Sequence, residues 1–218
     1  MSVLHLFTFL LLAGALTGQS INDPIAEKTI KDLRAKYEAY SSIEASFDLD
    51  INYRQGETDH QEGTLIQQGD SFVMDATTQA IYCDAKSVWM HLKESKEVQI
   101  NDFDEEAELA NFSPNSILAL YDNGDYEFAI TNESMKSGVL IQQIEFKPLD
   151  EDSEYAKIRL SIDKKKQELQ GFELFSKDGT KVSLKIKSLK VDIQYPSNIF
   201  VFNKYENPNV HIEDLRID

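Results

Sequence analysis

Residues 43–54, with the sequence IEASFDLDINYR, alternate apolar and polar side chains without interruption. Successive side chains of a β-strand point to opposite faces, so this segment is predicted to be a strand with one apolar and one polar face. The apolar face carries Phe47, Leu49 and Ile51. We expect this face to lie against either a packed core or a cavity that holds a ligand.

A helix is predicted immediately before this strand. Asp23 followed by Pro24 is a favourable helix start, because the carboxylate can cap the first turn and proline fits the first helical position. Apolar residues then recur at alternating spacings of four and three, which places them on one helix face: Ala26, Ile30, Leu33, Tyr37 and Tyr40. This stripe should pack on an apolar surface, and the strand that begins at Ile43 is the nearest candidate.

Most of the remaining chain is predicted to form roughly ten short antiparallel strands joined by tight turns. Turns such as Asp178-Gly179 separate runs of alternating apolar side chains, which favours hairpins over helix crossovers. Residues 102–124 interrupt this pattern with a helix-compatible stretch that includes Ile117 and Leu120. The sequence therefore predicts a mainly β (α+β) fold, with one strongly curved antiparallel sheet wrapped around its own helices.

The first twenty residues differ from the rest of the chain. The run VLHLFTFLLLAGALTG is apolar, is too short to span a bilayer comfortably and is followed by small residues, which is typical of a secretory signal peptide. We therefore expect a signal peptide at residues 1–20 and one exported domain at residues 21–218. Cys83 is the only cysteine, so no disulfide is expected and the thiol should be buried and unpaired.

Charge and motifs narrow the function further. The net charge of −16 disfavours nucleic acid and anionic membrane surfaces as partners. Asp48, Asp50 and Asn52 are spaced like the start of a calcium loop, but Tyr53 occupies the position where that loop requires glycine. The sequence has no nucleophile elbow, P-loop or H-E-x-x-H motif. We therefore expect no enzymatic activity, no metal and no cofactor.

Several segments, taken in order, resemble the outer-membrane lipoprotein carrier (LolA) family: IEASFDLDI, QEGTLI, IYCDAKSVWMHLKESKEVQIND, IRLSIDKKKQELQGFELFSKDGTKVSLKIK and FVFNKYENPNVHIEDLR. The resemblance covers essentially the whole mature chain. It implies an unclosed antiparallel β-barrel with an α-helical lid that encloses a hydrophobic cavity. The implied function is that of a periplasmic carrier, which shelters the acyl chains of lipoproteins between the two membranes.

The resemblance also implies partners for such a carrier. An inner-membrane ATP-binding-cassette exporter would load acylated lipoproteins onto it, and an acceptor at the outer membrane would receive them. The carrier itself is expected to be a monomer. The alternative on the same fold is a secreted regulatory protein that senses lipids or lipoproteins without shuttling them.

Residues of the expected cavity follow from the same resemblance. Phe47 matches the family's Ala-x-Phe strand position, and Phe72 and Met74 fall where the family has aromatic cavity residues. Trp89, the only tryptophan, fits either core packing or ligand contact. The expected lipid-binding set is Phe47, Leu49, Ile51, Leu65, Phe72, Met74, Trp89, Ile117, Leu120, Leu160 and Ile162.

One departure from the family concerns the lid. Well-known members have an arginine after the G-x-L strand that holds the helical lid shut, whereas the corresponding segment here, Gln68, Gly69 and Asp70, contains none. Arg34 and Arg54 are the candidate replacements.

Overall fold

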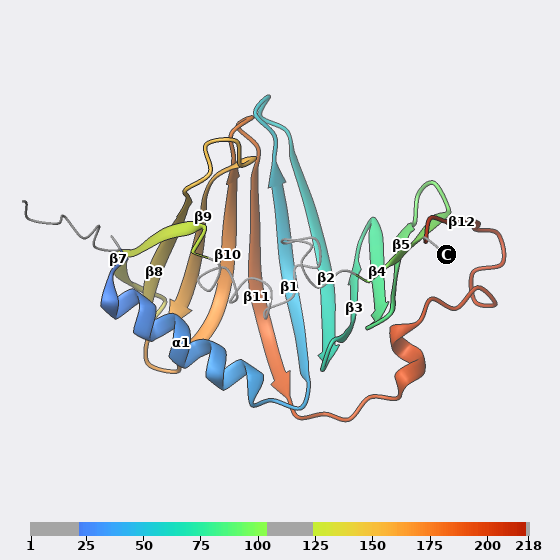
Figure 1. Cartoon of the computed structure of the whole chain (residues 1–218), viewed down its shortest axis with the longest axis horizontal. Coiled ribbons are helices and arrows are strands. Elements are labelled where there is room, and N and C mark those ends of the chain that lie inside the picture. Colours follow the sequence, from blue (N-terminus) through green and yellow to red (C-terminus); the bar gives the residue numbers. More distant parts are fainter. Residues whose placement is uncertain (1–21, 104–123, 217–218) are drawn as a thin grey trace, which may run out of the picture.

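The computed structural model describes residues 22–103 and 124–216. The expected signal peptide and two residues of the expected cavity, Ile117 and Leu120, lie outside the described residues. The described part contains one α-helix, one 3₁₀ helix and twelve β-strands, which form one sheet (Figure 1).

Helix α1 covers Pro24–Glu38 and begins where the sequence predicts. The Asp23 side chain caps it by accepting a hydrogen bond from the backbone N–H of Ile25 at 2.8 Å. This bond holds the pKa of the Asp23 carboxyl below its ordinary value. The predicted apolar stripe is confirmed, because its helical members are buried: Ala26, Ile30, Leu33 and Tyr37.

Two antiparallel meanders, β1–β6 and β7–β11, join through the pairing of β1 with β11. The strand order is β12-β6-β5-β4-β3-β2-β1-β11-β10-β9-β8-β7, and only the β12–β6 pair is parallel within the described chain. Because β7 and β12 are the edges, the sheet is open, as predicted. The strands are β1 (Ile43–Asn52), β2 (Thr58–Gln68), β3 (Ser71–Ala76), β4 (Gln79–Asp84), β5 (Ser87–Leu92), β6 (Glu97–Asp102), β7 (Tyr126–Lys136), β8 (Val139–Pro148), β9 (Tyr155–Asp163), β10 (Glu168–Ser176), β11 (Lys181–Val191) and β12 (His211–Asp214).

Helix α1 packs on one face of the curved sheet, which we call the inner face (Figure 1). Beneath the helix, one buried cluster joins α1 to β7–β10 and includes Ile30, Phe146 and Leu160. A second buried cluster lies on the inner face of β1–β4 and includes Phe47 and Phe72. The inner face therefore carries most of the apolar surface that folding buries.

The opposite, outer face of β4–β6 is covered by the C-terminal segment. This segment contains the 3₁₀ helix Ser197–Phe200 and then β12, which adds to the edge of the sheet beside β6. Between them, Phe202 packs with Val98 and Ile100 in a third hydrophobic cluster. This part of the sheet is therefore apolar on both faces.

Candidate functional site

An apolar cavity lies on the inner face, between the two buried clusters. The space free of atoms is about 450 Å³ when the open mouth of the cavity is included. The cavity is narrow, because the centre of a water-sized molecule can reach only about 20 Å³ of this space. None of the described residues that line it is charged, so it suits an apolar ligand. Those residues are Tyr37, Ala45, Phe47, Leu65, Met74, Leu169, Phe172, Leu184, Ile186 and Leu189.

Two β-bulges decide which side chains reach the cavity. The register of β11 against β1 shifts, so that Ile186 and Leu189 both face inward although one is even-numbered and the other odd. A bulge in β10 has the same effect on Leu169 and Phe172. Between them, a Cβ on Gly171 would lie 2.2 Å from a backbone oxygen of β11, so the close approach of these strands requires glycine.

Tyr37 connects α1 to the cavity wall. Its hydroxyl accepts a hydrogen bond from the backbone N–H of Leu169 at 3.1 Å, and both groups are buried. Burial raises the pKa of Tyr37 to about 12, so the hydroxyl stays protonated at neutral pH. This bond ties the last turn of the helix to β10 and fixes one side of the cavity.

The structure brings part of the expected lipid-binding set together. Phe47, Leu65 and Met74 line the cavity. Phe72 belongs to the adjoining buried cluster of β1–β4, and Leu49 packs against it while partly buried. These five residues therefore share one continuous apolar surface on the inner face.

Other members of the expected set lie elsewhere on the inner face. Ile51 is half-buried and lies nearer to the hairpin that joins β1 and β2. Leu160 and Ile162 are almost fully buried beneath α1, in its close-packed cluster. These two side chains are part of the core under the helix and do not line the cavity.

Trp89 lies on the outer face, so its assignment to the cavity was wrong. Cys83 pairs with Val88 and Tyr82 with Trp89, so Trp89 points away from the inner cluster that holds Cys83. Trp89 instead packs with Phe202 in the cluster beneath the C-terminal segment. The physical reason is that β5 is covered on both faces, so an apolar residue there does not identify the inner face.

The other lining residues were not expected from the sequence. Ala45 could have been added, because it alternates with Phe47 on the first strand. Leu184 and Ile186 lie in a run with apolar residues on a single face. Leu169 and Leu189 could not be found by alternation, because each is separated from its inner-facing neighbour by a bulge.

Cys83 is buried and free, as predicted. Burial raises the pKa of its thiol to about 11, so the thiolate needed for nucleophilic attack is scarce at neutral pH. His91 lies on the opposite face of the sheet, because Ala80 and not Cys83 pairs with it. Cys83 therefore has the properties of a small apolar core residue.

One group of described residues has the spacing of a metal site. Potential ligand atoms of Asp48, His60 and Glu62 lie within 4.8 Å of one another on the outer face. The Lys187 ammonium lies 2.8 Å from Asp48 and 3.1 Å from Glu62, and a hydrogen bond to Asp50 raises the pKa of His60. These contacts form a cross-strand ion-pair cluster, which accounts for the close spacing of the three side chains.

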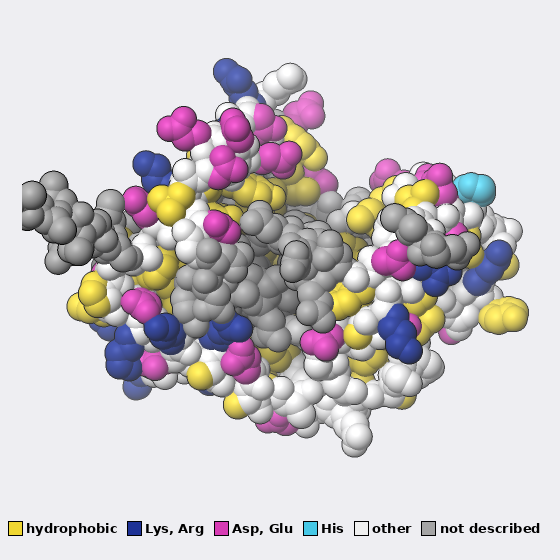
Figure 2. All heavy atoms as spheres, in the orientation of Figure 1, with side chains coloured by type: hydrophobic (Ala, Val, Ile, Leu, Met, Phe, Trp, Pro, Cys, Tyr) yellow, Lys and Arg dark blue, Asp and Glu magenta, His cyan; other side chains and the backbone are white. Residues whose placement is uncertain are grey.

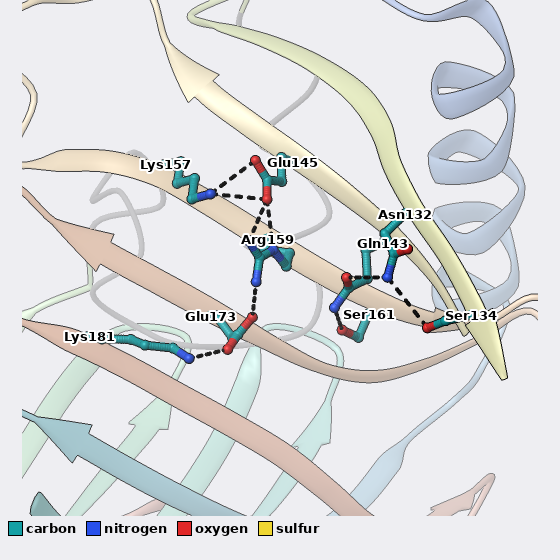
Figure 3. A network of polar contacts seen from close by, with 9 residues as sticks. All are labelled: Asn132, Ser134, Gln143, Glu145, Lys157, Arg159, Ser161, Glu173 and Lys181. Carbon is teal, nitrogen blue, oxygen red and sulfur yellow. Dashed lines mark hydrogen bonds and ion pairs between the residues drawn. The ribbon is translucent and has the colours of Figure 1, made fainter. Parts of the chain in front are cut away.

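A polar network lies on the outer face of β8–β11, of which β10 and β11 line the cavity (Figure 3). Glu145 accepts hydrogen bonds from Lys157 and Arg159, Arg159 also donates to Glu173 at 2.9 Å, and Glu173 pairs with Lys181. Burial alone would raise the pKa of Glu145, but the bonds from Arg159 and Lys157 outweigh it and hold the pKa below its ordinary value. Ion pairs between side chains of neighbouring strands therefore link β8, β9, β10 and β11.

These features define the class of protein. An open, curved sheet with a helix on its inner face and an uncharged apolar cavity between them is an arrangement that suits the binding of hydrophobic ligands. Figure 2 shows acidic side chains at the upper end of the molecule and hydrophobic side chains directly below them. The sequence profile of the family described as "Outer membrane lipoprotein carrier protein LolA" matches residues 38–203. The chain belongs to this family, as the resemblance predicted.

One solved structure shows the same fold, and two others are similar at lower TM-scores. An uncharacterized conserved protein from Thermus thermophilus is 10% identical, with a TM-score of 0.57 over 87% of this chain and 99% of that chain. A putative outer membrane lipoprotein-sorting protein domain from Vibrio parahaemolyticus is 15% identical, with a TM-score of 0.43 over 83% and 97%. A LolA superfamily protein from Nitrosomonas europaea is 14% identical, with a TM-score of 0.42 over 83% and 98%. No curated protein matches the sequence.

Two further findings concern the membrane and the lid. Within residues 22–103 and 124–216, no helix is long and apolar enough to cross a bilayer. Arg34 donates to Glu38 on α1, and the side chain of Arg54 lies beside Gly179. The helices expected to form the lid lie outside the described residues, so either arginine stays a candidate for the latch.

Proposed function

We propose that this protein is a periplasmic carrier that shelters the acyl chains of lipoproteins on its inner face and moves them from the inner to the outer membrane. The observation that carries the proposal is the uncharged cavity between α1 and the sheet, in a chain that belongs to the LolA family. Residues 1–20 would act as the export signal. The partners would be an inner-membrane ATP-binding-cassette exporter and an outer-membrane acceptor.

The energetics of transfer explain why such a cavity is useful. Each buried methylene contributes about 0.8 kcal/mol, so an acylated protein does not cross water unaided. A carrier must offset most of this cost without holding its cargo too tightly. A surface of apolar side chains without fixed polar groups meets both requirements.

The narrowness of the cavity adds a requirement. Because only about 20 Å³ admits the centre of a water-sized molecule, the lining side chains must move apart before an acyl chain can enter. Met74 lies in this wall, and methionine adapts its shape readily because its side chain is unbranched and flexible. Empty and loaded states would therefore differ in side-chain packing on the inner face.

Leu49→Glu tests this function. Leu49 is partly buried beside the cavity, so the carboxylate can reach water in the empty protein but would face the acyl chain in the loaded one. Asn52→Asp is the matched control, because it adds the same charge on the outer face of the same strand. The assay is release of lipoprotein from spheroplasts by the purified protein, together with the denaturant midpoint of each variant.

We expect Leu49→Glu to fold and lose most of the release, while Asn52→Asp releases lipoprotein normally. Equal release by both variants would contradict the proposal.

Mass spectrometry of material purified with the wild-type protein distinguishes a carrier from a lipid sensor. A carrier should yield acylated protein, whereas a lipid sensor should yield free lipid or nothing.

A further inference from the structure

A polar pocket adjoins the apolar cavity at the end of α1, where the chain turns into β1. Tyr37 borders both spaces. The pocket encloses about 440 Å³ with its open mouth, of which about 140 Å³ admits the centre of a water-sized molecule, and its lining includes Glu38, Gln67 and Asp70. Leu65 lines the cavity and Gln67 follows two residues later on the same face of β2, so the polar pocket lies next to the apolar cavity.

Gln67 contributes a hydrogen-bond acceptor that has no partner within the described part of the chain. Its side chain is buried, with 6% of the residue exposed. Its Nε2 donates to the backbone oxygen of Gly69 at 3.2 Å, and this bond fixes the orientation of the amide because the reverse orientation would bring two acceptors together. Its Oε1 is buried and accepts no hydrogen bond from residues 22–103 or 124–216. A buried carbonyl left unpaired is costly, so this position favours a ligand that brings a donor.

The surroundings restrict the chemistry of that ligand. Residues two apart on a strand are about 7 Å apart, so a ligand whose acyl tail lies beside Leu65 places its polar linkage near Gln67. Glu38 and Asp70 line the pocket. Although Arg34 pairs with Glu38, the charge near the pocket stays negative overall and disfavours an anionic head group. The N–H of an amide is a neutral donor, whereas the oxygen of an ester supplies none.

We propose that Gln67 recognises the linkage of the acyl ligand, with Oε1 accepting a hydrogen bond from the N–H of an N-acyl amide. This proposal rests on the proposed function, because it requires an acyl chain in the cavity. Because this oxygen is buried in the empty protein, the groups that cover it must move aside when the ligand binds. The protein consequently prefers N-acylated ligands to the corresponding esters.

The test compares N-methylhexadecanamide with methyl hexadecanoate, which differ only in N–H against oxygen at the linkage. Binding to the full mature chain is measured by displacement of anilinonaphthalene sulfonate. One net hydrogen bond predicts about three- to tenfold tighter binding of the amide. Gln67→Met, which keeps the length of the side chain without the acceptor, should abolish this preference. The denaturant midpoint of the empty protein should change little, because removal of the unpaired buried oxygen offsets the loss of the hydrogen bond to Gly69.

Gln61→Met is the matched control. Gln61 is also a buried inner-face glutamine of β2, but its amide is fully engaged, with Asp59 as acceptor and Thr78 as donor. This variant should lose stability and keep the preference for the amide. Gln67→Leu repeats the test with a second side chain.

Each outcome of the comparison decides a different question. Equal affinity of the wild-type protein for amide and ester would overturn the role of Gln67 and leave the proposed function intact. Failure of both ligands to bind would overturn the proposed function together with this inference. An N-palmitoylated peptide in a third arm distinguishes the source of the amide. Tighter binding than the simple amide supports a lipoprotein ligand, and weaker binding contradicts it.

Discussion

The ring of Phe47 occupies the space that a side chain at position 63 would need. The two residues face each other across β1 and β2, and a Cβ on Gly63 would lie 2.5 Å from Cζ of Phe47 and 2.7 Å from the backbone oxygen of Asp75. Phe47 can therefore lie flat against β2 only because residue 63 has no side chain. The position of a principal cavity residue depends on a glycine of the neighbouring strand.

Gly63→Ala should consequently destabilise the protein. The added methyl group must displace either the Phe47 ring or the backbone of β3, and overpacking of this kind typically costs about 1–3 kcal/mol. Urea unfolding at neutral pH measures the loss. The double variant Gly63→Ala/Phe47→Leu should lose less than the sum of the single changes, because the smaller side chain leaves room for the methyl group. Strict additivity would show that the ring is not the group that gives way.

The outer network predicts a pH-dependent effect of Arg159→Met. The pKa values of Glu145 and Glu173 lie below their ordinary values, since their cationic partners outweigh the effect of burial. A lowered carboxyl pKa contributes stability above the unfolded value of about 4.3, and this stability is lost as the pH falls through the folded value. Arg159→Met should therefore cost about 1–3 kcal/mol at pH 7 and clearly less at pH 3.

The matched control for this network is Lys28→Met. Lys28 pairs with Asp32 on the exposed face of α1, and an exposed pair of this kind contributes little. Denaturant unfolding of both variants at the two pH values gives the comparison. A loss in Arg159→Met that is the same at pH 3 as at pH 7 would show that packing of its side chain, and not its charge, supports the sheet.

Trp89 should report on the C-terminal segment and not on the cavity. Because Trp89 packs with Phe202 on the outer face, Phe202→Ala should shift its emission to the red and raise its quenching by acrylamide. Phe72→Ala on the inner face should leave the emission unchanged in the folded protein, as should binding of an acyl ligand. Since the chain has a single tryptophan, the emission needs no correction for other residues. A large shift on ligand binding would show that the two faces are coupled.

The sequence by itself determined the main elements and their inner sides. The strict alternation from Ile43 to Asn52 requires one apolar face, since a strand has a side-chain period of two, and β1 has that face against the core and cavity. Asp23 and Pro24 mark the start of α1 because they satisfy its first turn. The family resemblance indicated Phe47, Leu65 and Met74 as cavity residues. They line the wall because the pairing of β1, β2 and β3 is regular there and keeps their alternating side chains on the inner face.

Only the tertiary structure decided the rest of the cavity. The bulges in β10 and β11 shift the alternation by one residue. Leu169 and Leu189 therefore line the cavity although the alternation of the rest of their strands would place them on the outer face. The C-terminal segment covers the outer face of β4–β6, so Trp89 on that face packs in a separate hydrophobic cluster. Both effects depend on contacts between segments far apart in the chain. Local periodicity records which residues avoid water, but it does not record which of two buried surfaces each residue joins.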